Sequence, residues 1–173
     1  MNDWIFLKNI NDCKIIIGMK PSFILEWNVN ELSRALKINE DDVIEYFTDG
    51  RRVSFLMERS IRNHFGWKLS PSEGAAFDLV DQNNARWEVR SVSKNIYFCP
   101  SYMVGSGRDF DLDGFLEKLN QVSGYILTDI MSFPHAKVWK ISVETVRKWW
   151  DQGKLGDKTH VSRKTILQLL EEL

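Results

Sequence analysis

The chain has 173 residues, of which 43% are hydrophobic and 12% aromatic, and its formal net charge is −1. This length suits one compact domain, and a charge so close to zero argues against a histone-like protein that coats nucleic acid without specificity. We expect a soluble cytoplasmic protein, because the sequence shows no signal peptide, no apolar run long enough to cross a bilayer and no disulfide spacing of its two cysteines.

The first fifty residues predict two short strands followed by two helices. Residues 4–7 and 14–19 are rich in isoleucine and aromatic side chains, and Pro21 ends the second strand. Further on, five apolar residues occupy the positions that a helix-turn-helix motif buries: Leu32, Leu36, Ile38, Val43 and Phe47. Lys37 stands where that motif usually has its turn glycine, and Asn39 can cap the second helix.

The second of these helices is strongly acidic, with carboxylates at Glu40, Asp41, Asp42 and Glu45. Such a helix would repel the phosphates of DNA, so a packed helical hairpin is the preferred interpretation over a DNA-reading motif. The neighbouring pair Arg51 and Arg52 is a better candidate for phosphate contact, with a solvated turn as the alternative.

A third helix is expected from about residue 54 to 65, with Phe55, Glu58, Ile61 and Phe65 on one face. Glu58 is then a carboxylate within an apolar stripe, which is costly unless the group is paired or bound to something. Arg62, four residues later, is the simplest partner.

The segments Phe77–Val80 and Arg86–Val92 flank a polar loop and predict a β-hairpin. Side chains alternate along a strand, so Trp87 and Val89 point to one face while Glu88 and Arg90 point to the other. A hairpin in the right register brings Asp78 and Glu88 together with a cation beside them. Two converging carboxylates make a hard oxygen site suited to Mg²⁺.

The remaining sequence predicts a glycine-containing loop with Arg108 as a further DNA-contact candidate, then a helix, two strands and two helices. The first helix follows an acidic turn, the strands cover residues 125–130 and 136–141, and Ser142 and Ser162 cap the last two helices. Core positions are expected at Leu112, Phe115, Leu116, Leu119, Val143, Val146, Trp150, Ile166, Leu167, Leu169 and Leu170. This order predicts an α/β fold, a mixed central sheet flanked by helices, in a single domain 1–173 that comprises an N-terminal region 1–53 and a core 54–173.

The acidic pair Asp78 and Glu88, the basic Arg90 two residues later and the order of the elements together resemble the PD-(D/E)XK nuclease superfamily, which includes most type II restriction endonucleases. The resemblance covers roughly residues 54–173. It implies a restriction-endonuclease-like core in which Asp78 and Glu88 bind Mg²⁺ (or Mn²⁺) and Glu58, on the preceding helix, completes the site. It also implies site-specific cleavage of double-stranded DNA by a homodimer, and a cognate DNA methyltransferase elsewhere.

Arg90 departs from the superfamily pattern, which usually has lysine at this position. An arginine can neutralise a phosphate but does not pass on its proton, and Lys94 is a candidate to supply the missing amine. Phe77 replaces the proline of the motif. Two alternatives therefore stay open: a non-cleaving, helix-turn-helix-like DNA-binding regulator built around residues 30–47, and an interaction module in which Asp78 and Glu88 are merely solvated.

Overall fold

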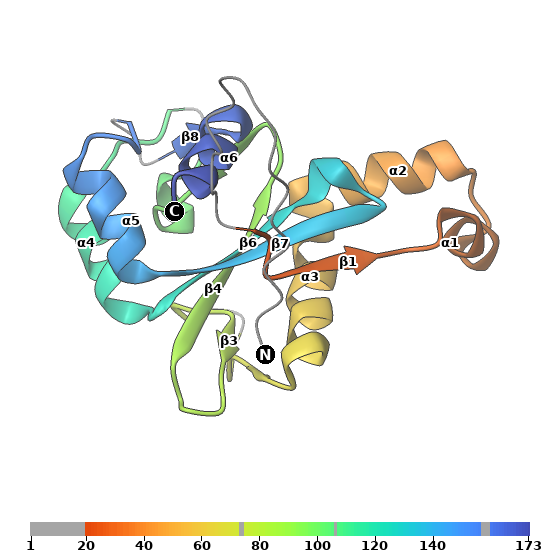
Figure 1. The fold of residues 1–173 in the computed structure, drawn as a ribbon, viewed down its shortest axis with the longest axis horizontal. Helices are drawn as coiled ribbons and strands as arrows, with labels where there is room; N and C mark the ends of the chain where they lie inside the picture. The colour runs from red at the N-terminus through yellow and green to blue at the C-terminus, as the bar shows by residue number, and fades with distance from the viewer. Residues whose placement is uncertain (1–19, 73–74, 106, 157–159) are drawn as a thin grey trace, which may run out of the picture.

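The computed structural model describes residues 20–72, 75–105, 107–156 and 160–173, so the predicted strands 4–7 and 14–19 lie outside the described residues. The fold is α/β, with a mixed, curled six-stranded sheet in the order β1-β7-β6-β4-β3-β2 (Figure 1). Strands β4 and β6 are parallel, and every other neighbouring pair is antiparallel. The strands are β1 (Phe23–Glu26), β2 (Lys68–Leu69), β3 (Leu79–Val80), β4 (Arg86–Val92), β6 (Gly124–Asp129) and β7 (His135–Ser142). Two further strands, β5 (Asn95–Tyr97) and β8 (His160–Ser162), pair with each other.

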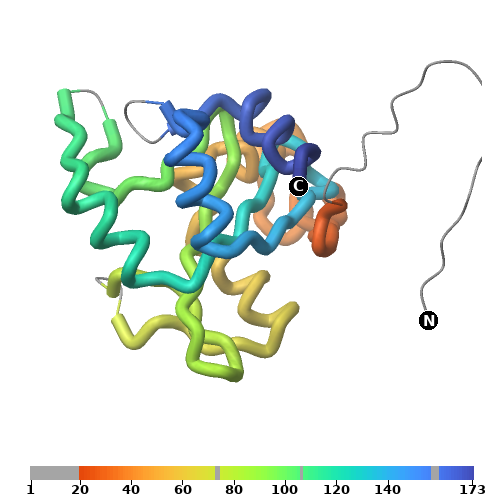
Figure 2. The backbone as a smooth tube through the Cα atoms, turned by 60° about the vertical axis from the view of Figure 1, so that its left-hand side comes forward, coloured from red at the N-terminus to blue at the C-terminus, as the bar shows by residue number. Residues whose placement is uncertain are grey.

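Helices cover both faces of the sheet. The helices are α1 (Val29–Leu36), α2 (Glu40–Thr48), α3 (Gly50–Phe65), α4 (Leu112–Gln121), α5 (Val143–Asp151) and α6 (Arg163–Glu171), with short 3-10 turns η1 (Ser101–Met103) and η2 (Ile130–Ser132). Figures 1 and 2 show α4 and α5 together on the side of the sheet away from α3. None of the helices in the described part of the chain has the length and apolar character that a bilayer-spanning helix needs.

The alternation of side chains in β6 builds two separate cores. Tyr125 and Leu127 pack with residues of α4, α5 and α6, whereas Ile126 packs on the opposite face with residues of α2 and α3. All six residues of β6 are buried, because helices cover both of its faces. The central parallel pair β4 and β6 is thereby held rigidly between two helical layers.

The C-terminal expectations are largely confirmed. The two strands lie within one residue of their predicted bounds, and Ser142 and Ser162 accept hydrogen bonds from the backbone N–H groups of Thr145 and Thr165. One core prediction is wrong, because Leu112 is exposed; Trp150 packs against the core while partly buried, and its neighbour Trp149 is buried.

Helix α3 begins at Gly50, four residues before its predicted start. The Asp49 carboxylate accepts the backbone N–H of Arg51 at 2.9 Å and caps the helix there. The buried stripe is Val53, Met57 and Ile61, and Phe55 is 54% exposed, so the predicted core face of this helix is wrong in part.

Helices α1 and α2 form the expected helical pair. Lys37 adopts a left-handed conformation with φ of 58°, which lets a lysine end α1 where a glycine is usual. Asn39 occupies the cap position of α2, but its side chain makes no capping hydrogen bond. Val43 and Phe47 are buried, whereas Leu36 and Ile38 are exposed, so burial of these last two was predicted wrongly.

Candidate active site

The β3–β4 hairpin places Asp78 beside Glu88. Leu79 pairs with Trp87 and Val80 with Arg86, the backbone N–H of Asp78 donates to the carbonyl of Trp87 at 3.0 Å, and both acids line the same cavity. The loop is closed by Asp81, whose carboxylate accepts the backbone N–H groups of Asn83 and Ala85 and the indole N–H of Trp87. This side chain fixes the loop, and through it the register of the acidic pair.

Asp78 directly precedes strand β3. Its side chain, rather than its backbone carbonyl, accepts a hydrogen bond from the neighbouring strand β4. Its Oδ2 accepts the backbone N–H of Val89 at 2.7 Å. Burial raises the pKa of the Asp78 carboxyl to about 6, repulsion from Glu88 acts in the same direction, and the Val89 hydrogen bond opposes both. The position of this carboxylate is thus fixed by the strand beside it.

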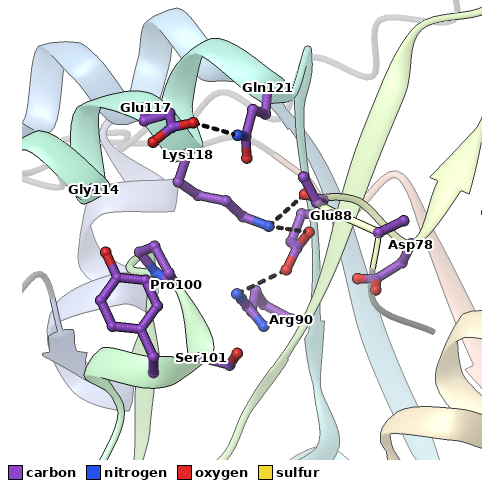
Figure 3. Close-up of a pocket in the computed structure, with 12 residues that line it drawn as sticks. Asp78, Glu88, Arg90, Pro100, Ser101, Gly114, Glu117, Lys118 and Gln121 are labelled. Carbon is purple, nitrogen blue, oxygen red and sulfur yellow. Dashed lines mark hydrogen bonds and ion pairs between the residues drawn. The ribbon is translucent and has the colours of Figure 1, made fainter. Parts of the chain in front are cut away.

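Glu88 is held between two cations (Figure 3). Its Oε2 accepts a hydrogen bond from Nζ of Lys118 at 2.6 Å, and its Oε1 lies 2.8 Å from Nη2 of Arg90. The ammonium of Lys118 also donates to the carbonyl oxygen of Ala76 at 2.6 Å. Glu88 is only 5% exposed, so both charge pairs lie in surroundings where they are weakly screened by water.

Glu58 approaches the site from α3. Burial raises the pKa of its carboxyl to about 7, and the negative charge of Asp78 is the next largest cause. The partner expected for it, Arg62, donates instead to Asn63, and the ion pair of Glu58 is with Arg59 at 3.4 Å. Glu58 and Asp78 line a shared cavity of about 410 Å³.

Three neighbouring cavities around these groups share lining residues. The first, of about 360 Å³, is lined by Asp78, Glu88, Arg90 and Lys118, and the second is the cavity of Glu58. A third, of about 860 Å³, shares Arg90 and Ser101 with the first and Ser54 with the second. Asp78 lines both the first and the second, so the acidic pair sits where the cavities meet.

The basic residues predicted to contact phosphate or DNA lie in different surroundings. Arg51 and Lys94 line the third cavity, and Lys94 therefore lies outside the cavity that contains Glu88. Arg52 is ion-paired with Glu45 at 3.4 Å and with Asp49 at 3.3 Å. Arg108 is exposed in the segment between η1 and α4 and lines none of the three cavities.

The carboxylates fit a hard divalent cation by their chemistry. Asp78 and Glu88 offer oxygen ligands of the kind that Mg²⁺ prefers, and their mutual repulsion is one cause of the raised Asp78 pKa. A cation between them would relieve that repulsion. As the side chains lie, no three histidine, cysteine or acidic residues of the described chain converge to hold an ion together, and Glu88 is satisfied by its two basic neighbours.

Lys118 was not predicted as a site residue, although its position in the sequence of α4 indicates that it needs a partner. It lies on the apolar face of α4 with Phe115 and Leu119, at the i−3 and i+1 positions, and is 7% exposed. A lysine within an apolar stripe needs a partner just as Glu58 does. Which partner it has depends on how α4 packs against the β3–β4 hairpin.

The sequence matches no protein-family model, and no curated protein matches it significantly. The function must therefore be inferred from the groups that line the three cavities.

Proposed function

We propose that this protein is a divalent-metal-dependent endonuclease that hydrolyses phosphodiester bonds of double-stranded DNA, as type II restriction endonucleases do. The observation that carries this proposal is the placement of Asp78 beside Glu88 by the hairpin, with Lys118 and Arg90 lining the same cavity. In this proposal α3, the β2–β3–β4 strands and α4 belong to a restriction-endonuclease-like core, in which a helix follows the acidic hairpin and packs on the sheet.

Asp78 and Glu88 would hold Mg²⁺ or Mn²⁺, and Glu58 would support them. A bound divalent ion lowers the pKa of water and neutralises charge on the attacked phosphate. Glu58, whose pKa is raised to about 7, is suited to accept the proton that the attacking water loses near neutral pH. The water oxygen bonds to phosphorus, the bond from phosphorus to the 3′-oxygen breaks, and that oxygen takes up a proton.

Lys118 supplies the amine that the motif lacks at position 90. An ammonium group has three N–H donors, and two of them are used by Glu88 and by the carbonyl of Ala76. The third is available for the attacking water or for a phosphate oxygen in the same cavity. Lys118 therefore takes the role for which Lys94 was considered.

Arg90 contributes fixed positive charge. One of its nitrogens is engaged by Glu88 at 2.8 Å, and its Nε is buried with no hydrogen-bond partner in the described part of the chain. The guanidinium lines the cavity of the acidic pair, so its charge lies where it would stabilise a phosphate placed there. With arginine in place of the motif's lysine at position 90, the positive charge that would stabilise the phosphate is kept.

A homodimer acting on a palindromic site, and a cognate methyltransferase that protects the host DNA, complete the proposal by analogy with type II enzymes. Both follow only if site-specific cleavage is found.

The test is incubation of the purified protein with unmethylated phage DNA in Mg²⁺, in Mn²⁺ and in EDTA. We expect discrete fragments that disappear with EDTA. Asp78→Asn keeps an acceptor for the Val89 N–H but removes the charge, and it should abolish cleavage while DNA binding in Ca²⁺ persists. The matched control is Glu117→Gln, a change of another carboxylate of the same cavity, which should cut normally.

Full cleavage by Asp78→Asn would overturn the assignment of the site. Absence of cleavage by the wild-type protein in both ions would overturn the endonuclease proposal. Tight, metal-independent binding to one operator sequence without cleavage would favour the regulator built around residues 30–47.

A further inference from the structure

We infer that the cavity of about 860 Å³ beside the acidic pair is a subsite for the sugar-phosphate backbone of a DNA strand, with Arg51 and Lys94 as its phosphate ligands. The inference deepens the proposed function and rests on it for the identity of the strand, which is the one that continues from the cleavage site. The two residues come from different elements, the first turn of α3 and the turn between β4 and β5.

The position of the cavity makes it an extension of the candidate active site. Arg90 and Ser101 line both this cavity and the one that contains Asp78 and Glu88. A strand whose phosphate lies at the acidic pair would reach the larger cavity by passing Arg90 and Ser101. The volume of that cavity suits a stretch of backbone better than a single inorganic anion.

The charge in the cavity is positive although acids also line it. Arg52 forms ion pairs with both Glu45 and Asp49, at 3.4 Å and 3.3 Å, so these two acids and the cations Arg51, Arg52 and Lys94 together leave one net positive charge. Within the described residues, the side chains of Arg51 and Lys94 have neither a hydrogen bond nor an ion pair, and both are exposed to solvent. Two unneutralised cations thus face the cavity, and an anionic polymer is the ligand that such an arrangement attracts.

Neutral donors complete the subsite. Ser91 lines the cavity from β4, and its Oγ is buried with no hydrogen-bond partner in the described structure. A buried hydroxyl without a partner is costly and gains most when a ligand oxygen reaches it. Together with the two cations it offers the charge-assisted and neutral donors that phosphate and sugar oxygens accept.

Arg51 and Arg52 make a matched pair for the test. They are adjacent, equally charged and both exposed, but only Arg51 lines the cavity without a partner. We would measure binding of a fluorescent DNA duplex by anisotropy in EDTA, over a series of KCl concentrations, so that the result does not depend on cleavage. The proteins are the wild type, Arg51→Ala, Lys94→Ala, the double variant and the control Arg52→Ala.

Each lost phosphate contact lowers the slope of log K against log salt by about 0.9, so the double variant should lose about 1.8 from the slope. At about 0.1 M KCl we expect roughly tenfold weaker binding for each single variant. Arg52→Ala should leave the slope unchanged, because Arg52 does not line the cavity, and should weaken binding less than Arg51→Ala does. Thermal melting checks that all variants are folded, and Arg51→Gln and Lys94→Gln replace any that are not.

Equal losses for Arg51→Ala and Arg52→Ala, an unchanged slope in the double variant, or no DNA binding by the wild type would each overturn the inference. The experiment distinguishes failure of the proposed hydrolysis from failure of the subsite. If binding depends on Arg51 and Lys94 but no cleavage occurs in Mg²⁺ or Mn²⁺, the nuclease proposal is refuted and the subsite is supported. Cleavage with an unchanged salt slope would refute the subsite alone.

Discussion

Nζ of Lys118 lies 2.6 Å from the carboxylate of Glu88, although 30 residues separate the two in the chain. The contact joins helix α4 to strand β4 and places an ammonium group at the acidic pair. A lysine two positions after Glu88 would approach the same carboxylate from the strand itself. The packing of α4 thus brings in from another element the amine that Arg90 does not provide.

Removing this ammonium should destabilise the protein as well as inactivate it. Lys118→Met leaves Glu88 with Arg90 as its only basic partner, and breaking a buried pair costs about 3–5 kcal/mol, reduced here by the remaining ion pair. We expect a loss of about 2–3 kcal/mol in the free energy of unfolding, measured with urea. In the double variant with Glu88→Gln, the two losses should be clearly less than additive. Strictly additive losses would mean that the 2.6 Å contact contributes no coupling.

Replacing Arg90 by lysine tests which residue supplies the amine. If Lys118 does so, Arg90→Lys keeps the positive charge beside Glu88 and should cleave DNA within about threefold of the wild type. Arg90→Met removes that charge and should lower the cleavage rate by about a hundredfold, as the loss of one donor to a charged transition state does. A tenfold or greater gain of activity in Arg90→Lys would contradict the role given to Lys118.

A second buried ion pair serves as a structural comparison. Asp129, 2% exposed at the end of β6, accepts two hydrogen bonds of 2.8 Å from the guanidinium of Arg163 at the start of α6. Arg163→Met leaves the buried carboxylate of Asp129 without its ion-pair partner. This should lower the free energy of unfolding, measured with urea, by about 3–5 kcal/mol, and cleavage should be retained below the new melting temperature. Arg147→Met removes only an exposed hydrogen bond to Asn120 and should cost less than about 1 kcal/mol. Lost cleavage by folded Arg163→Met would show that this pair acts beyond stability.

The acidic hairpin could be predicted because its signals are local. Strand alternation sets the face of each side chain, and the polar loop between residues 80 and 86 marks the turn, so a hairpin that brings Asp78 and Glu88 together in the right register could be predicted. The serine caps of α5 and α6 are local in the same sense, since each depends on a residue three positions away.

The start of α3 and the partners of the acids could not be predicted as well. The helix was predicted to start near residue 54, but the side chain of Asp49 caps it earlier and places Arg51 in its first turn. Lys118 reaches Glu88 only because α4 packs against the hairpin, and no spacing in the sequence encodes that approach. Long-range contacts of this kind depend on the whole fold, so Asp78 and Glu88 could be singled out from the sequence whereas the contact of Lys118 with Glu88 could not.

The raised pKa values of the acids predict how pH and Mg²⁺ interact. Burial raises the pKa of Glu58 from 4.5 to about 7 and that of Asp78 from 3.8 to about 6, so the folded protein binds these protons more tightly than the unfolded chain does. Their contribution to stability is therefore present below about pH 4 and is lost as pH rises towards 7. A divalent ion relieves the repulsion between the ionised groups and competes with protons for them.

We therefore expect saturating Mg²⁺ to raise the melting temperature by about 5 °C relative to EDTA at pH 8, and by no more than about 1 °C at pH 5, measured by thermal scans of the same protein. Asp78→Asn should remove most of the Mg²⁺ effect at pH 8, because it removes one of the two charges that the ion neutralises. Glu117→Gln, in the same cavity, should keep it. An equal Mg²⁺ effect at both pH values, or one that survives Asp78→Asn, would mean that the ion binds somewhere other than at Asp78 and Glu88.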